Sequence, residues 1–148
     1  MSPDVIVIGA GPAGLAAAIA AARHGVDTLV LERRALPADK ACGEGVMPSG
    51  VAALRALGVD AAGRDLRGIR YVDGGTRVEA PFRGGPGRGI RRTALHTALH
   101  QRARDLGVRI VPGKVGEVRQ SADRVSAAGL TARWLIAADG LHSPLRRG

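Results

Sequence analysis

Six residues near the amino terminus, Gly9-Ala10-Gly11-Pro12-Ala13-Gly14, separate a short apolar run from a long alanine-rich stretch. The apolar run at residues 4–8 predicts a buried parallel strand, and residues 12–24 predict a helix. Residues 28–32 predict a second strand that ends at Glu32. A strand, a glycine-rich turn, a helix and a strand that ends in an acidic residue together form a dinucleotide-binding unit, so this pattern constrains the fold to the α/β class.

Each glycine of the turn has its own predicted role. Gly9 would allow the tight turn out of the strand, Gly11 would let the backbone approach a pyrophosphate, and Gly14 would let the helix pack closely on the sheet. The helix start points free N–H groups and the positive end of its dipole at that pyrophosphate. Glu32 is placed to accept hydrogen bonds from the ribose of an adenosine. A turn that only packs a helix on a sheet would explain Gly14 but not Gly11, so we predict adenine dinucleotide binding.

Composition bounds the size and the partners of the chain. With 148 residues it has the length of one domain. Its hydrophobic content is 45%, but the only aromatic residues are Tyr71, Phe82 and Trp134, so Ala, Val, Leu and Ile must build the core. The net charge of +9 comes almost entirely from scattered arginines, which we interpret as compositional bias. Few aromatics and no basic run predict that nucleic acid is not a partner.

Cysteine and histidine usage adds further limits. Cys42 is the only cysteine, so an internal disulfide is excluded. The amino terminus lacks the basic flank of a signal peptide, and no apolar stretch reaches the ~20 residues of a membrane span. We therefore expect a cytoplasmic protein with no integral membrane segment. His96 and His100 have the spacing of two metal ligands on one helix face, but without a third ligand we expect a solvated face and no metal.

The rest of the chain alternates helical and strand patterns. Ser49 could cap a short helix that stops at Gly58, and Thr93 could cap a longer helix that ends at Gly107. Strands are expected at residues 69–72, 77–82, 108–111, 115–119, 124–127 and 134–138, the last of them buried.

Two further segments remain, a glycine-rich stretch and the last residues of the chain. Glycine-rich residues 83–89 predict a connecting loop, because no helix with the spacing of a phosphate site follows at once. After the last expected strand, Ser143 is placed to cap a new helix with Pro144 in its first turn. A domain rarely ends at the start of a helix, so we expect the chain to be truncated, the front part of a longer protein.

Four segments, in order, resemble one superfamily. They are the turn at residues 9–14 with Glu32, the loop Lys40-Ala41-Cys42-Gly43-Glu44-Gly45, the helix start Arg92-Thr93-Ala94-Leu95, and residues 136–146 with Asp139-Gly140. Together they resemble the FAD-dependent group A flavoprotein monooxygenases and their relatives, which have the fold of p-hydroxybenzoate hydroxylase; the loop resembles the geranylgeranyl reductase-like branch. The resemblance implies a Rossmann-like FAD/NAD(P)-binding domain over residues 1–148, an α/β domain with a parallel sheet and a β-meander. This domain would be incomplete, because the family's third, GD motif and its substrate domain are absent.

The resemblance also implies cofactor contacts around the first motif. The three glycines would approach the FAD pyrophosphate, Glu32 would bind the adenosine ribose, and Arg33 would flank the adenosine.

Further contacts would come from later segments. Arg92 would reach the FAD phosphates or the ribityl chain, and Val115 would pair with the adenine through its backbone. Asp139 would bind the ribityl or pyrophosphate region, and Cys42 would lie near the flavin. The implied cofactor-binding residues are Gly9, Gly11, Pro12, Ala13, Gly14, Glu32, Arg33, Cys42, Gly43, Arg92, Val115, Asp139 and Gly140.

Three functions follow as hypotheses. The first is an NAD(P)H-dependent flavoprotein monooxygenase that hydroxylates a small organic substrate, in which the cofactor carries the chemistry and no side chain is assigned as catalytic. The second, favoured by the loop around Cys42, is reduction of isoprenoid double bonds. The third is a non-catalytic adenine-dinucleotide-binding fragment. From the residues alone, simpler interpretations stay open. Cys42 could be an ordinary loop residue, and Arg92 could belong to a solvated pair. Glu44 could be a surface acid, and Asp139 could be a turn residue.

Overall fold

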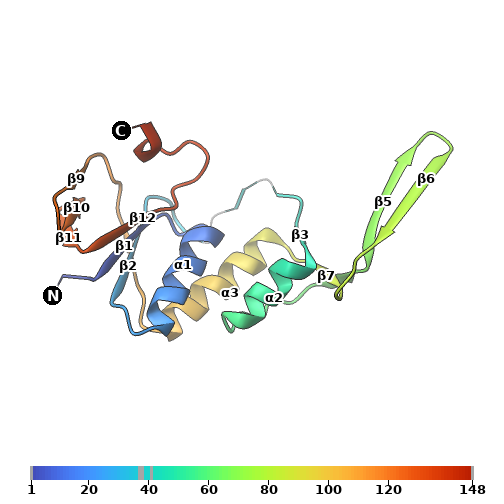
Figure 1. Cartoon of the computed structure of the whole chain (residues 1–148), viewed down its shortest axis with the longest axis horizontal. Helices are drawn as coiled ribbons and strands as arrows, with labels where there is room; N and C mark the ends of the chain where they lie inside the picture. Colours follow the sequence, from blue (N-terminus) through green and yellow to red (C-terminus); the bar gives the residue numbers. More distant parts are fainter. Residues whose placement is uncertain (1, 37–38, 41, 148) are drawn as a thin grey trace. The chain divides into compact units, whose positions relative to one another are not determined.

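The computed structural model describes residues 2–36, 39–40 and 42–147, and its elements are labelled in Figure 1. The chain divides into two compact units. The first unit comprises Met1–Ala38 and Leu99–Gly148, and the second comprises Asp39–Ala98. The predicted glycine turn and both strands that flank it belong to the first unit.

A four-stranded parallel sheet forms the centre of the first unit. Its strands are β1 (Val5–Ile8), β2 (Thr28–Glu32), β8 (Arg109–Pro112) and β12 (Trp134–Ala137), in the order β12-β1-β2-β8. Every residue of β1 is buried, and so are the first four residues of β2. Both strands therefore have the continuous apolar runs of a parallel sheet that is covered on both faces, as the sequence predicts.

Helix α1 (Pro12–Arg23) connects β1 to β2 and packs on the sheet. Proline occupies its first position, where a missing N–H is tolerated. The side of the helix that is buried carries Gly14, Leu15, Ala18 and Ile19. His24 follows the last helical residue, so the helix ends one position before the predicted boundary.

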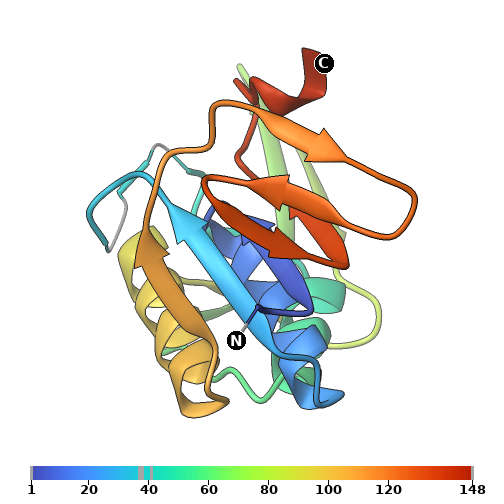
Figure 2. The same cartoon turned by 90° about the vertical axis from the view of Figure 1, so that its left-hand side faces the viewer.

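A β-meander of β9 (Val118–Gln120), β10 (Val125–Ala127) and β11 (Leu130–Ala132) belongs to the same unit (Figure 2). Its strands are antiparallel, and its buried side chains form one apolar cluster with side chains of the parallel sheet. The expected strand at residues 115–119 begins only at Val118. Strand β11 was not expected. It follows a tight turn in which Ala128 and Gly129 both have positive φ, and alanine is a poor signal for such a turn.

Strand β12 differs from the expected buried strand. Leu135 and Ile136 are half-buried, but Ala137 is exposed and 64% of the Trp134 surface is accessible. The reason is that β12 lies at one edge of the sheet formed by the described residues. Beyond it, the hydroxyl oxygen of Ser143 accepts a hydrogen bond from the Arg146 N–H at 3.2 Å, which confirms Ser143 as the cap of a short 3-10 helix (Leu145–Arg147).

The second unit contains two small antiparallel sheets. One has the order β3-β7-β4, formed by β3 (Gly45–Val46), β7 (Gly87–Gly89) and β4 (Arg64–Leu66). The other is the hairpin of β5 (Gly68–Asp73) and β6 (Thr76–Pro81), which confirms the two predicted strands. The expected loop at 83–89 is therefore only partly a loop, because its last three residues pair with two other strands.

Both helix caps expected in this region are wrong, because each helix begins before the residue that was expected to cap it. Helix α2 (Pro48–Ala56) has Met47 as its N-cap, and Ser49 lies inside its first turn, because Pro48 takes the first helical position. Helix α3 (Arg92–Asp105) already includes Thr93. The expected ends are confirmed, since Gly58 and Gly107 follow the two helices with positive φ.

Candidate functional site

The chain leaves β1 and β12 at adjacent points of the sheet. The N–H of Gly9, directly after β1, donates to the carbonyl of Leu31 at 2.8 Å, and the N–H of Ala138, directly after β12, donates to the carbonyl of Ile8 at 2.8 Å. From β1 the chain proceeds outward to β2 and β8 and then returns to the other side of β1 as β12. In open α/β sheets, ligands bind in the crevice outside the carboxyl ends of the strands at such a reversal of strand order, so this is where a ligand is expected.

Gly9 and Gly14 are required by the packing of this turn. Gly9 has φ +101°, and a Cβ built on it would lie 2.5 Å from the carbonyl oxygen of Ala138. A Cβ on Gly14 would overlap the carbonyl oxygen of Gly9. Gly9 therefore makes the turn and Gly14 allows close packing, as predicted. The turn and the segment after β12 are therefore in van der Waals contact.

Gly11 is different because no packing requires it. It is the N-cap of α1, with φ −69° and ψ 174°, and a built Cβ meets no described atom within 4 Å. Gly11 therefore borders open space, and so does the exposed Ala13 two residues later.

Glu32 is bound to the glycine turn. Its carboxylate oxygen Oε2 accepts a hydrogen bond from the Ala10 N–H at 2.7 Å, and Oε1 accepts one from the Arg34 N–H at 2.9 Å. Glu32 was expected only to bind the ribose, and its direct contact with the turn was not predicted. The neighbouring Arg33 is exposed.

The remaining candidates of the first unit lie on loops. Asp139 is half-buried, and Gly140 is exposed with φ +94°. Val115 lies between β8 and β9, and its side chain belongs to the buried cluster of the sheet and the meander. Any contact of Val115 with a ligand must therefore come from its main chain.

Three candidates belong to the second unit. Cys42 and Gly43 are exposed, and the Cys42 Sγ accepts a hydrogen bond from the Glu44 N–H at 3.4 Å. Glu44 is exposed, and its carboxylate accepts a hydrogen bond from the Arg92 N–H at 3.1 Å. The Nε of Arg92 is buried and has no hydrogen-bond partner among the described residues.

The two histidines do not form the solvated face that was expected. His96 is completely buried and His100 is half-buried. His96 lies on the face of α3 that also carries buried Leu99 and Ala103, three and seven positions further on. Across the described part of the chain, no group of three or more His, Cys, Asp or Glu side chains could hold a metal ion.

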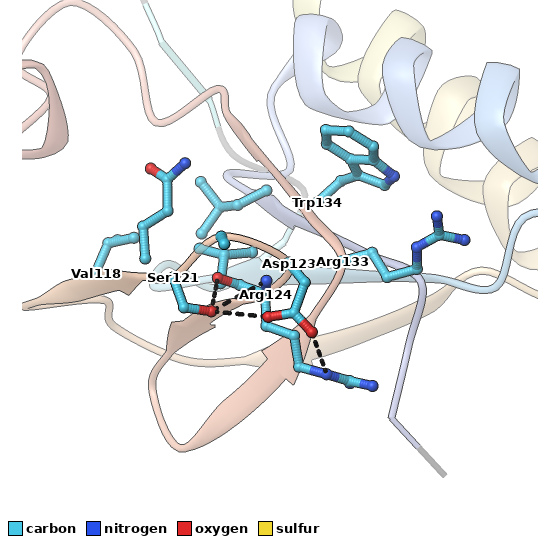
Figure 3. A pocket seen from close by; sticks show the side chains of 10 residues that line it. Val118, Ser121, Asp123, Arg124, Arg133 and Trp134 are labelled. Atoms are coloured by element: carbon cyan, nitrogen blue, oxygen red, sulfur yellow. Dashed lines mark hydrogen bonds and ion pairs between the residues drawn. The ribbon is translucent and has the colours of Figure 1, made fainter.

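A second hollow of about 500 Å³ lies at the opposite end of β12 (Figure 3). Arg133 and Trp134 at the start of that strand line it, together with the turn between β9 and β10. The polar groups of this turn bind one another, since Ser121 Oγ lies 3.1 Å from the Asp123 carboxylate and accepts from the Arg124 N–H at 3.2 Å. The hollow is at the amino end of the strand, so it is separate from the crevice at the carboxyl ends.

The strand–turn–helix–strand unit, its acidic end and the reversal of strand order at β1 are typical of the dinucleotide-binding proteins of the α/β class. A family model described as "FAD binding domain" matches residues 2–148. The chain therefore belongs to this family of FAD-dependent oxidoreductases. The resemblance stated from its motifs and the expected fold class are confirmed.

Relatives of two kinds were found. Menaquinone reductase of Mycobacterium tuberculosis is 39% identical, over 99% of this chain and 40% of the relative. Digeranylgeranylglycerophospholipid reductase 2 of Methanopyrus kandleri is 34% identical, again over 99% of this chain and 40% of the relative. The crystal structure of p-nitrophenol 4-monooxygenase PnpA from Pseudomonas putida is similar with a TM-score of 0.87 at 24% identity, over 98% of this chain and 42% of that one, which shows a shared fold.

The chain is shorter than these relatives. The chain spans about 40% of the length of the curated relatives that it matches. Within the described residues, none of the helices combines the length and the apolar character needed to cross a membrane.

Proposed function

We propose that residues 1–148 form part of the FAD-binding domain of an oxidoreductase that reduces an isoprenoid lipid with electrons from NAD(P)H. One observation carries the cofactor part: the glycine turn and the Asp139-Gly140 segment meet at the carboxyl ends of β1 and β12. The substrate part is supported by the curated relatives, two of which are named for menaquinone and for a digeranylgeranyl lipid. Both of these molecules carry polyprenyl chains.

The residues present fit the diphosphate of FAD. Gly11 leaves open space where a phosphate can approach the backbone. Helix α1 starts without a side-chain cap and has no acidic residue in its first turn, so nothing in that turn competes with an anion. Arg92 belongs to the second unit, and its role toward the phosphates is a separate proposal: its Nε is buried without a partner among the described residues, and a phosphate oxygen is an acceptor that a guanidinium binds well.

Glu32 can bind the ribose and keep its hydrogen bonds to the backbone of the turn. Each of its two oxygens accepts one backbone N–H. An ionised carboxylate offers about four lone-pair sites, so each oxygen keeps capacity for a ribose hydroxyl. Glu32 would thus orient the adenosine and keep the glycine turn in place at the same time.

The other predicted contacts remain proposals. Arg33 would flank the adenosine, and Val115 would pair with the adenine through its main chain. Asp139 would bind the ribityl or pyrophosphate region. The loop with Cys42 and Gly43 would lie near the flavin.

The chemistry supplied by bound FAD is two-electron transfer. In the proposed reaction NAD(P)H, one proton and a carbon–carbon double bond are consumed, and NAD(P)⁺ and a saturated bond are produced. The residues of this chain bind and orient the cofactor. None of them is assigned a catalytic role.

Calorimetric titration of the purified chain with FAD, NAD and ADP tests the cofactor. We expect FAD to bind more tightly than ADP or NAD, because contacts beyond the adenosine diphosphate add to its affinity. Equal affinity for FAD and ADP would favour a non-catalytic nucleotide-binding module. A chain that binds none of the three would refute the proposal.

A flavoprotein monooxygenase is the second candidate, favoured by the close fold match with p-nitrophenol 4-monooxygenase. The two candidates differ in what happens to oxygen. A protein that contains this chain, supplied with FAD, NAD(P)H and menaquinone or a prenyl lipid, should reduce the lipid under anaerobic conditions if the first proposal holds. Hydroxylation of an aromatic substrate with matching oxygen uptake would establish the second.

A further inference from the structure

Glu44 has a backbone conformation that its side chain does not favour. Its φ is +53°, in the left-handed region that a residue with a Cβ seldom adopts. Only one other non-glycine residue in the described part of the chain, Ala128, has positive φ. Strain of this kind persists when surrounding contacts hold the residue in place.

Three contacts within the second unit hold Glu44. Its carbonyl oxygen accepts a hydrogen bond from the Ile90 N–H at 2.7 Å, and its N–H donates to the Cys42 Sγ at 3.4 Å. Its carboxylate oxygen Oε1 accepts a hydrogen bond from the Arg92 N–H at 3.1 Å. One residue therefore connects the loop after Cys42 with the beginning of α3.

The contact with Arg92 is the cap of α3. The first N–H groups of a helix have no partner within the helix. In α3 the N–H of Leu95 donates to the carbonyl of Arg91, so the N–H of Arg92 precedes the intrahelical ladder. A carboxylate at this position satisfies the N–H and interacts favourably with the helix dipole. The cap comes from a residue 48 positions earlier in the chain.

We propose that Glu44 is a positioning residue that fixes the first turn of α3 and thereby the guanidinium of Arg92 for a phosphate of the cofactor. The inference rests on the proposed function, because it assumes that Arg92 binds FAD. The Nε of Arg92, which is buried and has no partner in the described part of the chain, is the group whose placement depends on that turn. Glu44 itself does not touch the cofactor in this proposal.

The first test needs no flavin. Amide hydrogen exchange is measured by NMR for the wild-type chain and for Glu44→Ala, Glu44→Gln and Glu79→Ala. Alanine at position 44 keeps a Cβ at the same φ, so Glu44→Ala removes the acceptor and leaves the backbone strain comparable. Glu79→Ala removes an equally negative side chain, which pairs with exposed Arg70 on the hairpin of the same unit.

We expect the Arg92 N–H to exchange about 10-fold faster in Glu44→Ala, with little change in Glu44→Gln, which keeps an acceptor oxygen, and none in Glu79→Ala. Unchanged exchange of the Arg92 N–H in Glu44→Ala would overturn the cap. Faster exchange throughout the unit in Glu44→Ala would mean general loosening and would also overturn it.

The second test asks whether Glu44 acts through Arg92. FAD affinity is measured for Glu44→Ala, Arg92→Ala and the double variant. We expect Glu44→Ala to weaken FAD binding about 5- to 10-fold in the wild-type background and less than about 2-fold in the Arg92→Ala background, because coupled residues are non-additive. Equal losses in both backgrounds would refute the positioning role.

A wild-type chain that takes up no FAD would refute the proposed function and, with it, the flavin part of this inference. The exchange experiment reports on the Glu44 cap in that case as well. The two failures are therefore distinguishable.

Discussion

Gly14→Ala should mainly lower stability, whereas Gly11→Ala should mainly lower FAD affinity. The two variants therefore separate the folding role of the turn from its ligand-binding role. A Cβ at Gly14 would overlap the carbonyl oxygen of Gly9 and lie 3.3 Å from the Cβ of Ala138. A Cβ at Gly11 would meet no described atom within 4 Å. The obstruction at Gly14 is mainly backbone, which cannot turn aside as a flexible side chain would.

The expected losses of stability follow from this geometry. An extra methyl group in a tightly packed site costs about 1–3 kcal/mol, and the higher helix propensity of alanine offsets only part of it. In a chain of 148 residues, a loss of 2 kcal/mol lowers the Tm by about 4–8 °C. Gly11 has φ −69° and ψ 174°, which alanine adopts readily, so Gly11→Ala should change the free energy of unfolding by less than about 1 kcal/mol.

The effect on the ligand should run the other way. Gly11→Ala should lower FAD affinity at least about 10-fold, equivalent to 1.4 kcal/mol, because the methyl group occupies the space through which a diphosphate reaches the backbone. Urea unfolding without flavin and calorimetric titration with FAD measure the two quantities separately. If Gly11→Ala binds FAD as the wild type does, or loses as much stability as Gly14→Ala, the division of roles is wrong.

Three further predictions concern single contacts. Glu32→Ala should lower the free energy of unfolding without flavin by about 1–3 kcal/mol, because two backbone N–H groups lose their acceptor. Glu32→Gln should lower it less. Equal losses for the two variants in a urea titration would mean that the contacts of the carboxylate with the turn are unimportant. Asp27→Asn breaks a half-exposed pair with Arg109 and should cost less than about 1 kcal/mol, a difference that 1 M salt should largely remove. Ser143→Ala removes the cap on the Arg146 N–H and should cost about 0.5–2 kcal/mol in thermal unfolding, whereas Ser143→Thr should be close to wild type.

Local sequence patterns predicted the elements whose structure depends mainly on their own residues. The continuous apolar run of β1 and β2, the proline that starts α1 and the glycine that follows each helix predicted these elements to within about one residue. The β5–β6 hairpin was equally clear, because Gly74-Gly75 joins two strand patterns. The first motif of the candidate site lies in such a stretch, so its position in the fold was predictable.

The predicted start of a helix was wrong where an adjacent residue was also suited to the helix start. Pro48 displaced Ser49 from the cap of α2, since proline is favoured at the first helical position. Strands β3 and β7 have two and three residues, which is too short for a periodic pattern to appear in the sequence.

What the sequence by itself determined is therefore the dinucleotide-binding unit and its α/β class. Only the tertiary structure decided which distant groups meet: β12 beside β1 with Trp134 exposed at the edge, His96 in the interior, Glu32 on the Ala10 N–H, and Glu44 on α3. Apolar periodicity and turn residues act over a few positions and can be read along the chain. Hydrogen bonds and burial between distant segments depend on how those segments pack, and no local pattern records that packing.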